Sequence, residues 1–252
     1  MLDLQRAGMW KRLSAALFDS IILFTVIVGM ALLLSTILNY DGYVTHLGEL
    51  EQKYGEEFGV DLNITAEEMN ELSEAERKVY EAADQAFATD PDVIYTYNMM
   101  LSMAVVIVTF SILLGYLLLE FLVPQLFGNG QTFGKKLFGI GVMRTDSVRL
   151  PAILLFARTV LGKFTIGTMI PVYVVIMIIF GRLGFFGTVI VGGLFLVQTI
   201  LFFGTHEHTP IHDKLAGTVT VDLGSQLIFE SPEALLEYKK RIHAESAAKQ
   251  ER

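Results

Sequence analysis

The chain has 252 residues, of which 52% are hydrophobic, and it has a mean hydropathy of +0.50 and a formal net charge of −8. This composition is too apolar for an ordinary soluble domain, which breaks its apolar residues into short amphipathic stripes. The absence of cysteine excludes disulfides, thiolate metal sites and cysteine nucleophiles.

Four long stretches contain no charged side chain: residues 20–38, 93–119, 164–181 and 183–205. A helix needs about 20 apolar residues to cross the hydrocarbon core of a bilayer. Three stretches have this length, and 164–181 reaches it if its helix starts near Arg158. The sequence therefore predicts an all-α integral membrane protein with about four transmembrane helices.

The first of these helices is expected from about Leu13 to Leu38. Its apolar stretch is too long for a cleaved signal peptide, and no small-residue cleavage site follows it. Basic residues lie just before it and in the later loops, and such residues mark the cytoplasmic side of a membrane helix. Both termini are therefore predicted in the cytoplasm. The basic residues used here are Arg6, Lys11, Arg12, Lys135, Lys136, Arg144, Arg149, Lys214, Lys239, Lys240 and Arg241.

Residues 39–97 carry 15 acidic and 3 basic side chains, and they are predicted to lie outside the cytoplasm. Thr65 and Ser73 each precede a Glu by three positions, the spacing of a capping box, so two polar helices are expected. A calcium loop starting at Asp61 is rejected, because its sixth position is Ala and its twelfth is Leu. We expect 41–97 to be an acidic helical insertion in the membrane domain.

The membrane domain would then comprise residues 1–40 and 98–222, followed by a charged cytoplasmic tail at 223–252. The second helix is expected over about 97–123, with Glu120 near its inner end.

The glycine-rich segment after that helix resembles a phosphate loop only superficially. Asn129 stands at the position of its first glycine and Lys136 at that of its metal-binding hydroxyl. We interpret the segment as interfacial, with Lys135 and Lys136 facing anionic lipid headgroups.

Two short segments alternate in polarity, Gly139–Arg144 and Gly217–Asp222, and each is too short to be stable alone. They are predicted to pair as a small cytoplasmic two-stranded β element. Ser231 and Pro232 form a good start for a tail helix over 233–251.

Charged residues in membrane helices are costly and need partners. Arg12 and Asp19 are two helical turns apart on one face, and topology places four further charges at the same depth. The favoured interpretation is a structural network that ties four helix ends together. The alternative is a cation or proton site at Asp19 and Glu120. The predicted network consists of Arg12, Asp19, Glu120, Arg158, Lys163 and Asp213.

His206, His208 and His212 with Asp213 form the one metal-like group, but the spacing of the first two suits no single helical face. We expect no metal, no cofactor and no catalytic residues, because the sequence also lacks a serine elbow and a zincin motif.

Three stretches together resemble the RDD family of membrane proteins: Ala7–Asp19, Gly130–Val142 and His212–Val219. The resemblance implies that Arg12, Asp19 and Asp213 are the residues for which the family is named. It also implies a multi-pass protein of the bacterial inner membrane. The 39–97 segment is long for the family, and four crossings exceed the three-helix core that the resemblance implies.

Two functions are compatible with these features. The favoured hypothesis is an accessory, assembly or interaction subunit that uses the acidic outer segment as a docking surface. The alternative is a small transporter of ions or solutes, with cation/proton exchange at Asp19 and Glu120. The lipid bilayer is an expected partner and nucleic acid is not, whereas a protein partner at the outer segment and a homo-oligomer are left open.

Overall fold

The computed structural model describes residues 5–179, 181, 184–201 and 210–250. The chain groups into two compact units, the first comprising Met1–Ile27 and Ile112–Arg252 and the second Val28–Ser111. Two long helices, α1 (Met9–Ile37) and α5 (Pro91–Tyr116), contribute residues to both units.

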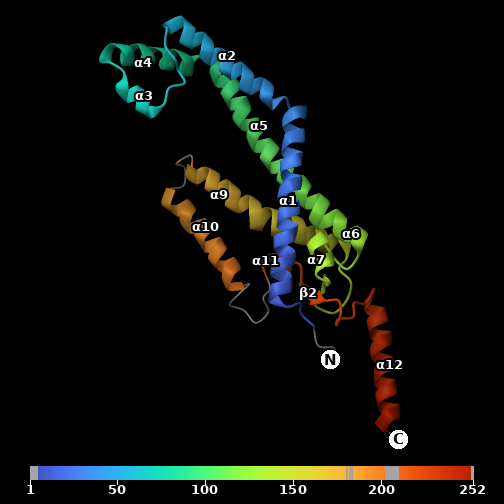
Figure 1. Cartoon of the computed structure of the whole chain (residues 1–252). Helices are drawn as coiled ribbons and strands as arrows, with labels where there is room; N and C mark the ends of the chain where they lie inside the picture. The colour runs from blue at the N-terminus through green and yellow to red at the C-terminus, as the bar shows by residue number, and fades with distance from the viewer. Residues whose placement is uncertain (1–4, 180, 182–183, 202–209, 251–252) are drawn as a thin grey trace. The chain divides into compact units, whose positions relative to one another are not determined.

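The first unit is mainly helical, as predicted. Its helix α9 lies beside α10 (Figure 1). Besides its part of α1 and α5, its helices are η1 (Leu117–Leu122), α6 (Val123–Phe127), α7 (Phe133–Leu137), α8 (Ala152–Ala157), η2 (Arg158–Met169), α9 (Ile170–Ile179), α10 (Gly184–Thr199), α11 (Ile211–Leu215) and α12 (Pro232–Gln250).

Three helices among the described residues are long and apolar enough to cross a membrane: α1, the continuous Pro91–Phe127 and the continuous Ala152–Ile178. Large apolar side chains such as Phe24 and Ile153 are exposed on them, as lipid-facing side chains are in the absence of lipid. The prediction of a membrane protein is confirmed. Helix α10 has a shorter apolar core, Phe185–Val197, so a fourth crossing stays a prediction.

The second and third long helices are not α-helical throughout. Helix α5 continues into the π-helix η1, and α8 continues into the π-helix η2 before α9 begins. A π-helix bonds each residue to the one five positions away, and such segments are frequent at functional sites. Both π-helices contain charged residues of the predicted network.

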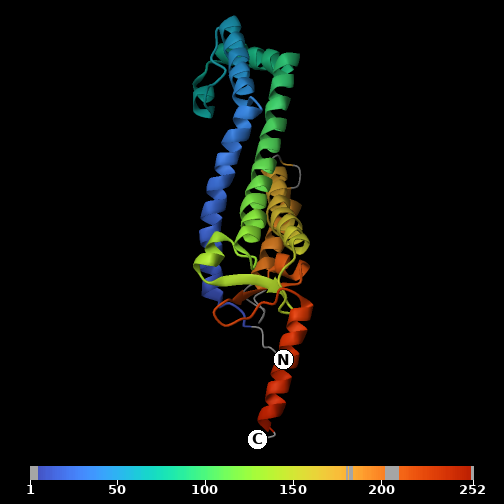
Figure 2. The same ribbon diagram turned by 90° about the vertical axis from the view of Figure 1, so that its right-hand side faces the viewer.

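The two predicted strands pair, which confirms the small β element. Strand β1 (Ile140–Arg144) is antiparallel to β2 (Thr218–Asp222), with Ile140 opposite Asp222 and Arg144 opposite Thr218. The N–H of Ala7 donates to the carbonyl of Thr220, so the start of the chain extends this sheet beside β2. The strands lie next to the N-terminal end of α1 (Figure 2).

The second unit contains α2 (Tyr40–Phe58), α3 (Ala66–Glu71) and α4 (Glu74–Thr89). Both predicted capping boxes are present, at Thr65 and at Ser73. Helix α2, for which no capping signal was found, follows α1 after a left-handed Asn39 and packs on α4.

Candidate functional site

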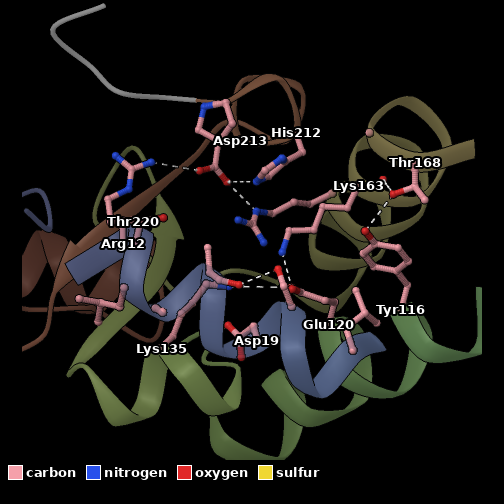
Figure 3. A pocket seen from close by; sticks show the side chains of 18 residues that line it. Arg12, Asp19, Tyr116, Glu120, Lys135, Lys163, Thr168, His212, Asp213 and Thr220 are labelled. Atoms are coloured by element: carbon pink, nitrogen blue, oxygen red, sulfur yellow. Dashed lines mark hydrogen bonds and ion pairs between the residues drawn. The ribbon is translucent and has the colours of Figure 1, made fainter. Parts of the chain in front are cut away.

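The first unit encloses a pocket of about 340 Å³ between α1, η1, α7, η2 and α11 (Figure 3). All six charged residues predicted as a network line this pocket, and Lys135 lines it as well. Tyr116, Thr168 and His212 complete its polar wall.

The π-helical geometry of η2 places its polar residues along this wall. Arg158, Lys163 and Thr168 are spaced by five residues, and all three line the pocket. This spacing matches the hydrogen bonds of a π-helix, which join residues five positions apart. In an α-helix, with 3.6 residues per turn, the same three positions would fan out to different faces. The hydroxyl of Thr168 contacts the Tyr116 hydroxyl at 2.9 Å, which ties η2 to the end of α5.

Asp213 is the most enclosed carboxylate of the pocket and is 1% exposed. Its Oδ1 accepts from Arg158 Nε at 2.6 Å and from the Thr218 hydroxyl at 3.0 Å, while its Oδ2 lies 3.9 Å from Arg12 Nη2. Burial alone would raise the pKa of this carboxyl, but the charge and hydrogen bond of Arg158, together with His212 and Lys135, outweigh burial and hold the pKa well below its usual range. Asp213 therefore stays ionised and joins α1, η2 and β2.

Asp19 was predicted to belong to the network of charged residues, but in the structure it accepts hydrogen bonds from uncharged groups. Its two oxygens accept from the Thr132 hydroxyl at 2.5 Å and from the N–H of Gly134 at 2.7 Å. Among the described residues it makes no ion pair within 4.0 Å. A Cβ on Gly134 would lie 2.3 Å from the carbonyl oxygen of Ala15, so only glycine lets α7 approach α1 this closely.

Glu120 faces two lysines, which approach it from different sides (Figure 3). Its Oε1 lies 2.5 Å from Lys163 Nζ, and its Oε2 lies 3.9 Å from Lys135 Nζ. The Glu120 Oε2 and the Lys135 Nζ are both buried and have no hydrogen-bond partner among the described residues. Buried polar atoms in proteins normally have a hydrogen-bond partner. The two atoms are therefore candidates for contact with a ligand in the pocket.

The position of Lys135 corrects its assignment to the lipid headgroups, because its side chain is only 8% exposed. The attachment of α7 to Asp19 turns Lys135 inward, whereas Lys136 is exposed. Burial lowers the pKa of Lys135 to about 7, against the attraction of Glu120.

His212 packs closely against η2, because the residue of η2 that faces it is Gly162. A Cβ on Gly162 would lie 2.4 Å from the His212 Cβ. Burial lowers the pKa of His212 to about 3 despite the nearby Asp213, so its imidazole is neutral. The described residues contain no group of three or more side chains arranged to hold a metal ion. His206 and His208 of the metal-like group lie outside the described residues.

Three lining residues, Tyr116, Thr168 and His212, are absent from the predicted network. The spacing of Thr168 from Lys163 and Arg158 is a signal only if a π-helix is assumed. Tyr116 precedes Glu120 by four positions, a spacing that places both on one face of an ordinary α-helix. The sequence could therefore have indicated Tyr116 more readily than Thr168. The pocket as built can hold a small polar or charged molecule, because volumes near 300 Å³ or more are typical of ligand sites.

In a comparison with protein families, the model of the RDD family matches residues 6–217. This range contains the first two stretches on which the resemblance was based. No curated protein and no solved structure matches the chain.

Proposed function

The chain belongs to the RDD family of membrane proteins, and from this premise we propose that it binds a small charged solute in the pocket of the first unit and transports it across the membrane. The role does not include catalysis. It takes up the transporter hypothesis but places the solute in the whole pocket rather than between Asp19 and Glu120.

One observation carries the proposal: a pocket of about 340 Å³ lies between α1, η1, α7, η2 and α11, and two buried atoms of its charged residues, Glu120 Oε2 and Lys135 Nζ, have no hydrogen-bond partner among the described residues. A purely structural network gains nothing from leaving these two atoms without partners, since each unsatisfied buried polar atom is costly. Charged residues that face a cavity in a membrane protein are typical of a solute pathway.

The finer topology belongs to the same proposal. We place the chain in the bacterial cell membrane with four crossings, the fourth formed by α10 (Gly184–Thr199). Both termini and the pocket then lie on the cytoplasmic side, and the acidic segment lies outside. Many transporters bind their solute near the bilayer midplane, whereas this pocket lies near the cytoplasmic leaflet. We therefore assign it as the site at which the solute enters from the cytoplasm.

The accessory-subunit hypothesis remains the second candidate, and one observation favours it. The acidic segment lies within the second compact unit, Val28–Ser111. Its helices α3 and α4 both begin with a capping box. A basic protein partner would relieve the repulsion among its surplus of negative charges.

Solute flux in proteoliposomes tests the transporter proposal. Purified protein would be assayed with a panel of monovalent cations and small carboxylates, each compared with empty liposomes. We expect flux of at least one solute, a large reduction in the Lys135→Met variant and little change in Lys136→Met, whose side chain is exposed. Absence of flux for every solute would favour the accessory role.

A further inference from the structure

The charges that line the pocket do not cancel. With Lys135 protonated, the lining over the described residues has four cationic side chains and three anionic ones, which leaves one positive charge in surplus because His212 is neutral. The cations are Arg12, Lys135, Arg158 and Lys163, and the anions are Asp19, Glu120 and Asp213.

The distances identify where this surplus lies. Arg158 is 2.6 Å from Asp213, and Lys163 is 2.5 Å from Glu120. Lys135 has only the second oxygen of Glu120, at 3.9 Å, beyond hydrogen-bond distance. Arg12 Nη2 is likewise 3.9 Å from Asp213 Oδ2. Of the four cations, however, Lys135 is the one whose buried nitrogen has no hydrogen-bond partner among the described residues, and this Nζ points into the pocket (Figure 3).

The second group without a partner sets a further requirement. Within the described part of the chain, Glu120 Oε2 is buried and lacks a donor, while the nearby Lys135 Nζ lacks an acceptor. A simple anion would satisfy the lysine but leave the carboxylate oxygen unmatched. An anion that carries its own hydroxyl can accept from Lys135 and donate to Glu120.

We propose that the pocket binds a small monoanionic ligand with a neighbouring hydroxyl group, its acidic group on Lys135 Nζ and its hydroxyl on Glu120 Oε2. This inference rests on the proposed function and specifies its ligand class. Two sources supply the chemistry: a dissolved hydroxy-carboxylate, and the glycerol phosphate headgroup of an anionic lipid. A cation-binding site at Asp19 and Glu120 fits less well, because Asp19 already accepts two hydrogen bonds and Glu120 already faces two lysines.

The inference has a consequence for pH. Lys135 has a pKa of about 7 in the unliganded pocket, and a bound anion would raise that pKa by stabilising the ammonium form. Binding would therefore take up a proton above about pH 7, so affinity should fall as pH rises and stay level below pH 7. The charged groups that face Lys135 are Asp19 on α1, Glu120 on η1, Arg158 and Lys163 on η2 and Asp213 on α11.

The test uses purified full-length protein and three probes at equal ionic strength: glycolate, acetate and chloride. Glycolate has the hydroxyl beside its carboxylate, and acetate lacks it. We expect glycolate to raise the thermal unfolding temperature clearly more than acetate, and chloride to have almost no effect. The shift should decline from about pH 7 upward, although glycolate itself does not titrate there.

Three variants connect the shift to the pocket. Lys135→Met should remove at least about 90% of the glycolate shift while raising the unfolding temperature without ligand, because it deletes a buried charge with no hydrogen-bond partner. A merely structural lysine would lower it. Lys135→Arg keeps a cation at all these pH values, so any shift it retains should lose its pH dependence. Lys136→Met is the matched control: it removes the contact of the Lys136 ammonium with the Phe127 ring and should keep the glycolate shift and its pH dependence.

A headgroup source is tested in mixed micelles with short-chain phosphatidylglycerol or phosphatidylcholine. Stabilisation by the glycerol lipid alone supports the inference and assigns the ligand to the membrane, whereas stabilisation by glycolate assigns it to the solution. If neither stabilises but a monovalent cation does, the anion inference is wrong while the solute-binding proposal stands. If no solute of either charge has an effect on the protein, both are wrong.

Discussion

Two arginines converge on Asp213, one at 2.6 Å from Oδ1 and one at 3.9 Å from Oδ2, in a place almost closed to solvent. Removing the charge of Asp213 leaves Arg158 and Arg12 without their shared carboxylate. The loss of one member of a buried ion pair costs about 3–5 kcal/mol. At the scale of residues, Asp213 is therefore a side chain on which the fold of the first unit depends strongly.

We predict that Asp213→Asn lowers the unfolding free energy by about that amount, 3–5 kcal/mol, measured by denaturant unfolding in detergent. Adding Arg158→Met should recover part of the loss, because it removes one of the stranded charges. The control is Asp146→Asn, which breaks the exposed pair with Arg144 and should cost less than about 1 kcal/mol. Equal effects of Asp213→Asn and Asp146→Asn would contradict the description of the network.

A different outcome is expected for Asp19. Its partners are neutral donors, the Thr132 hydroxyl and the Gly134 N–H, so neutralising a basic residue should not rescue it. Asp19→Asn keeps one acceptor oxygen and should cost about 1–3 kcal/mol. Combining it with Thr132→Val should cost less than the two single losses added, since both remove the same hydrogen bond. Rescue by Lys135→Met instead would indicate an ion pair with that lysine.

At the scale of elements, the sequence predicted the long helices, the two strands and both capping boxes, because each follows from a short-range pattern of apolar, glycine or cap residues. It did not predict the inward turn of Lys135. That turn depends on the contact between α7 and α1, which needs both Asp19 and the missing side chain at Gly134. The π-helix η2 was not predicted, because the sequence was analysed with the α-helical period of 3.6 residues per turn. At that period, residues five positions apart lie on different faces, so the alignment of Arg158, Lys163 and Thr168 is not visible.

The close approach of α7 to α1 gives a prediction of its own. Gly134→Ala would place a Cβ 2.3 Å from the carbonyl oxygen of Ala15, so α7 must move and weaken its hydrogen bond to Asp19. Overpacking of this kind costs about 1–3 kcal/mol, and thermal unfolding in detergent should show it. Gly192→Ala on α10, where a Cβ meets nothing within 4 Å, is the control. If both variants unfold alike, the contact is looser than described.

At the scale of the whole molecule, the account depends on which side of the membrane each segment occupies. The chain has no cysteine, so single cysteines can report on this directly. We predict that a membrane-impermeant thiol reagent applied to intact cells labels Glu57→Cys, and labels Asp146→Cys and Glu245→Cys only after permeabilisation. All three positions are exposed, so burial does not protect them. Labelling of Asp146→Cys from outside would overturn the proposed topology.

The most direct test of the central claim, that a solute-accessible pocket with a cationic surplus lies among these helices, is the reactivity of a cysteine placed inside it. Thr168→Cys puts a thiol on the pocket wall, and Glu245→Cys on the tail gives the exposed control. We predict that anionic sulfonatoethyl methanethiosulfonate modifies Thr168→Cys faster than its cationic trimethylammonium analogue does, relative to the control, and that glycolate slows the reaction. No reaction at Thr168→Cys, or a faster reaction with the cationic reagent, would contradict the account.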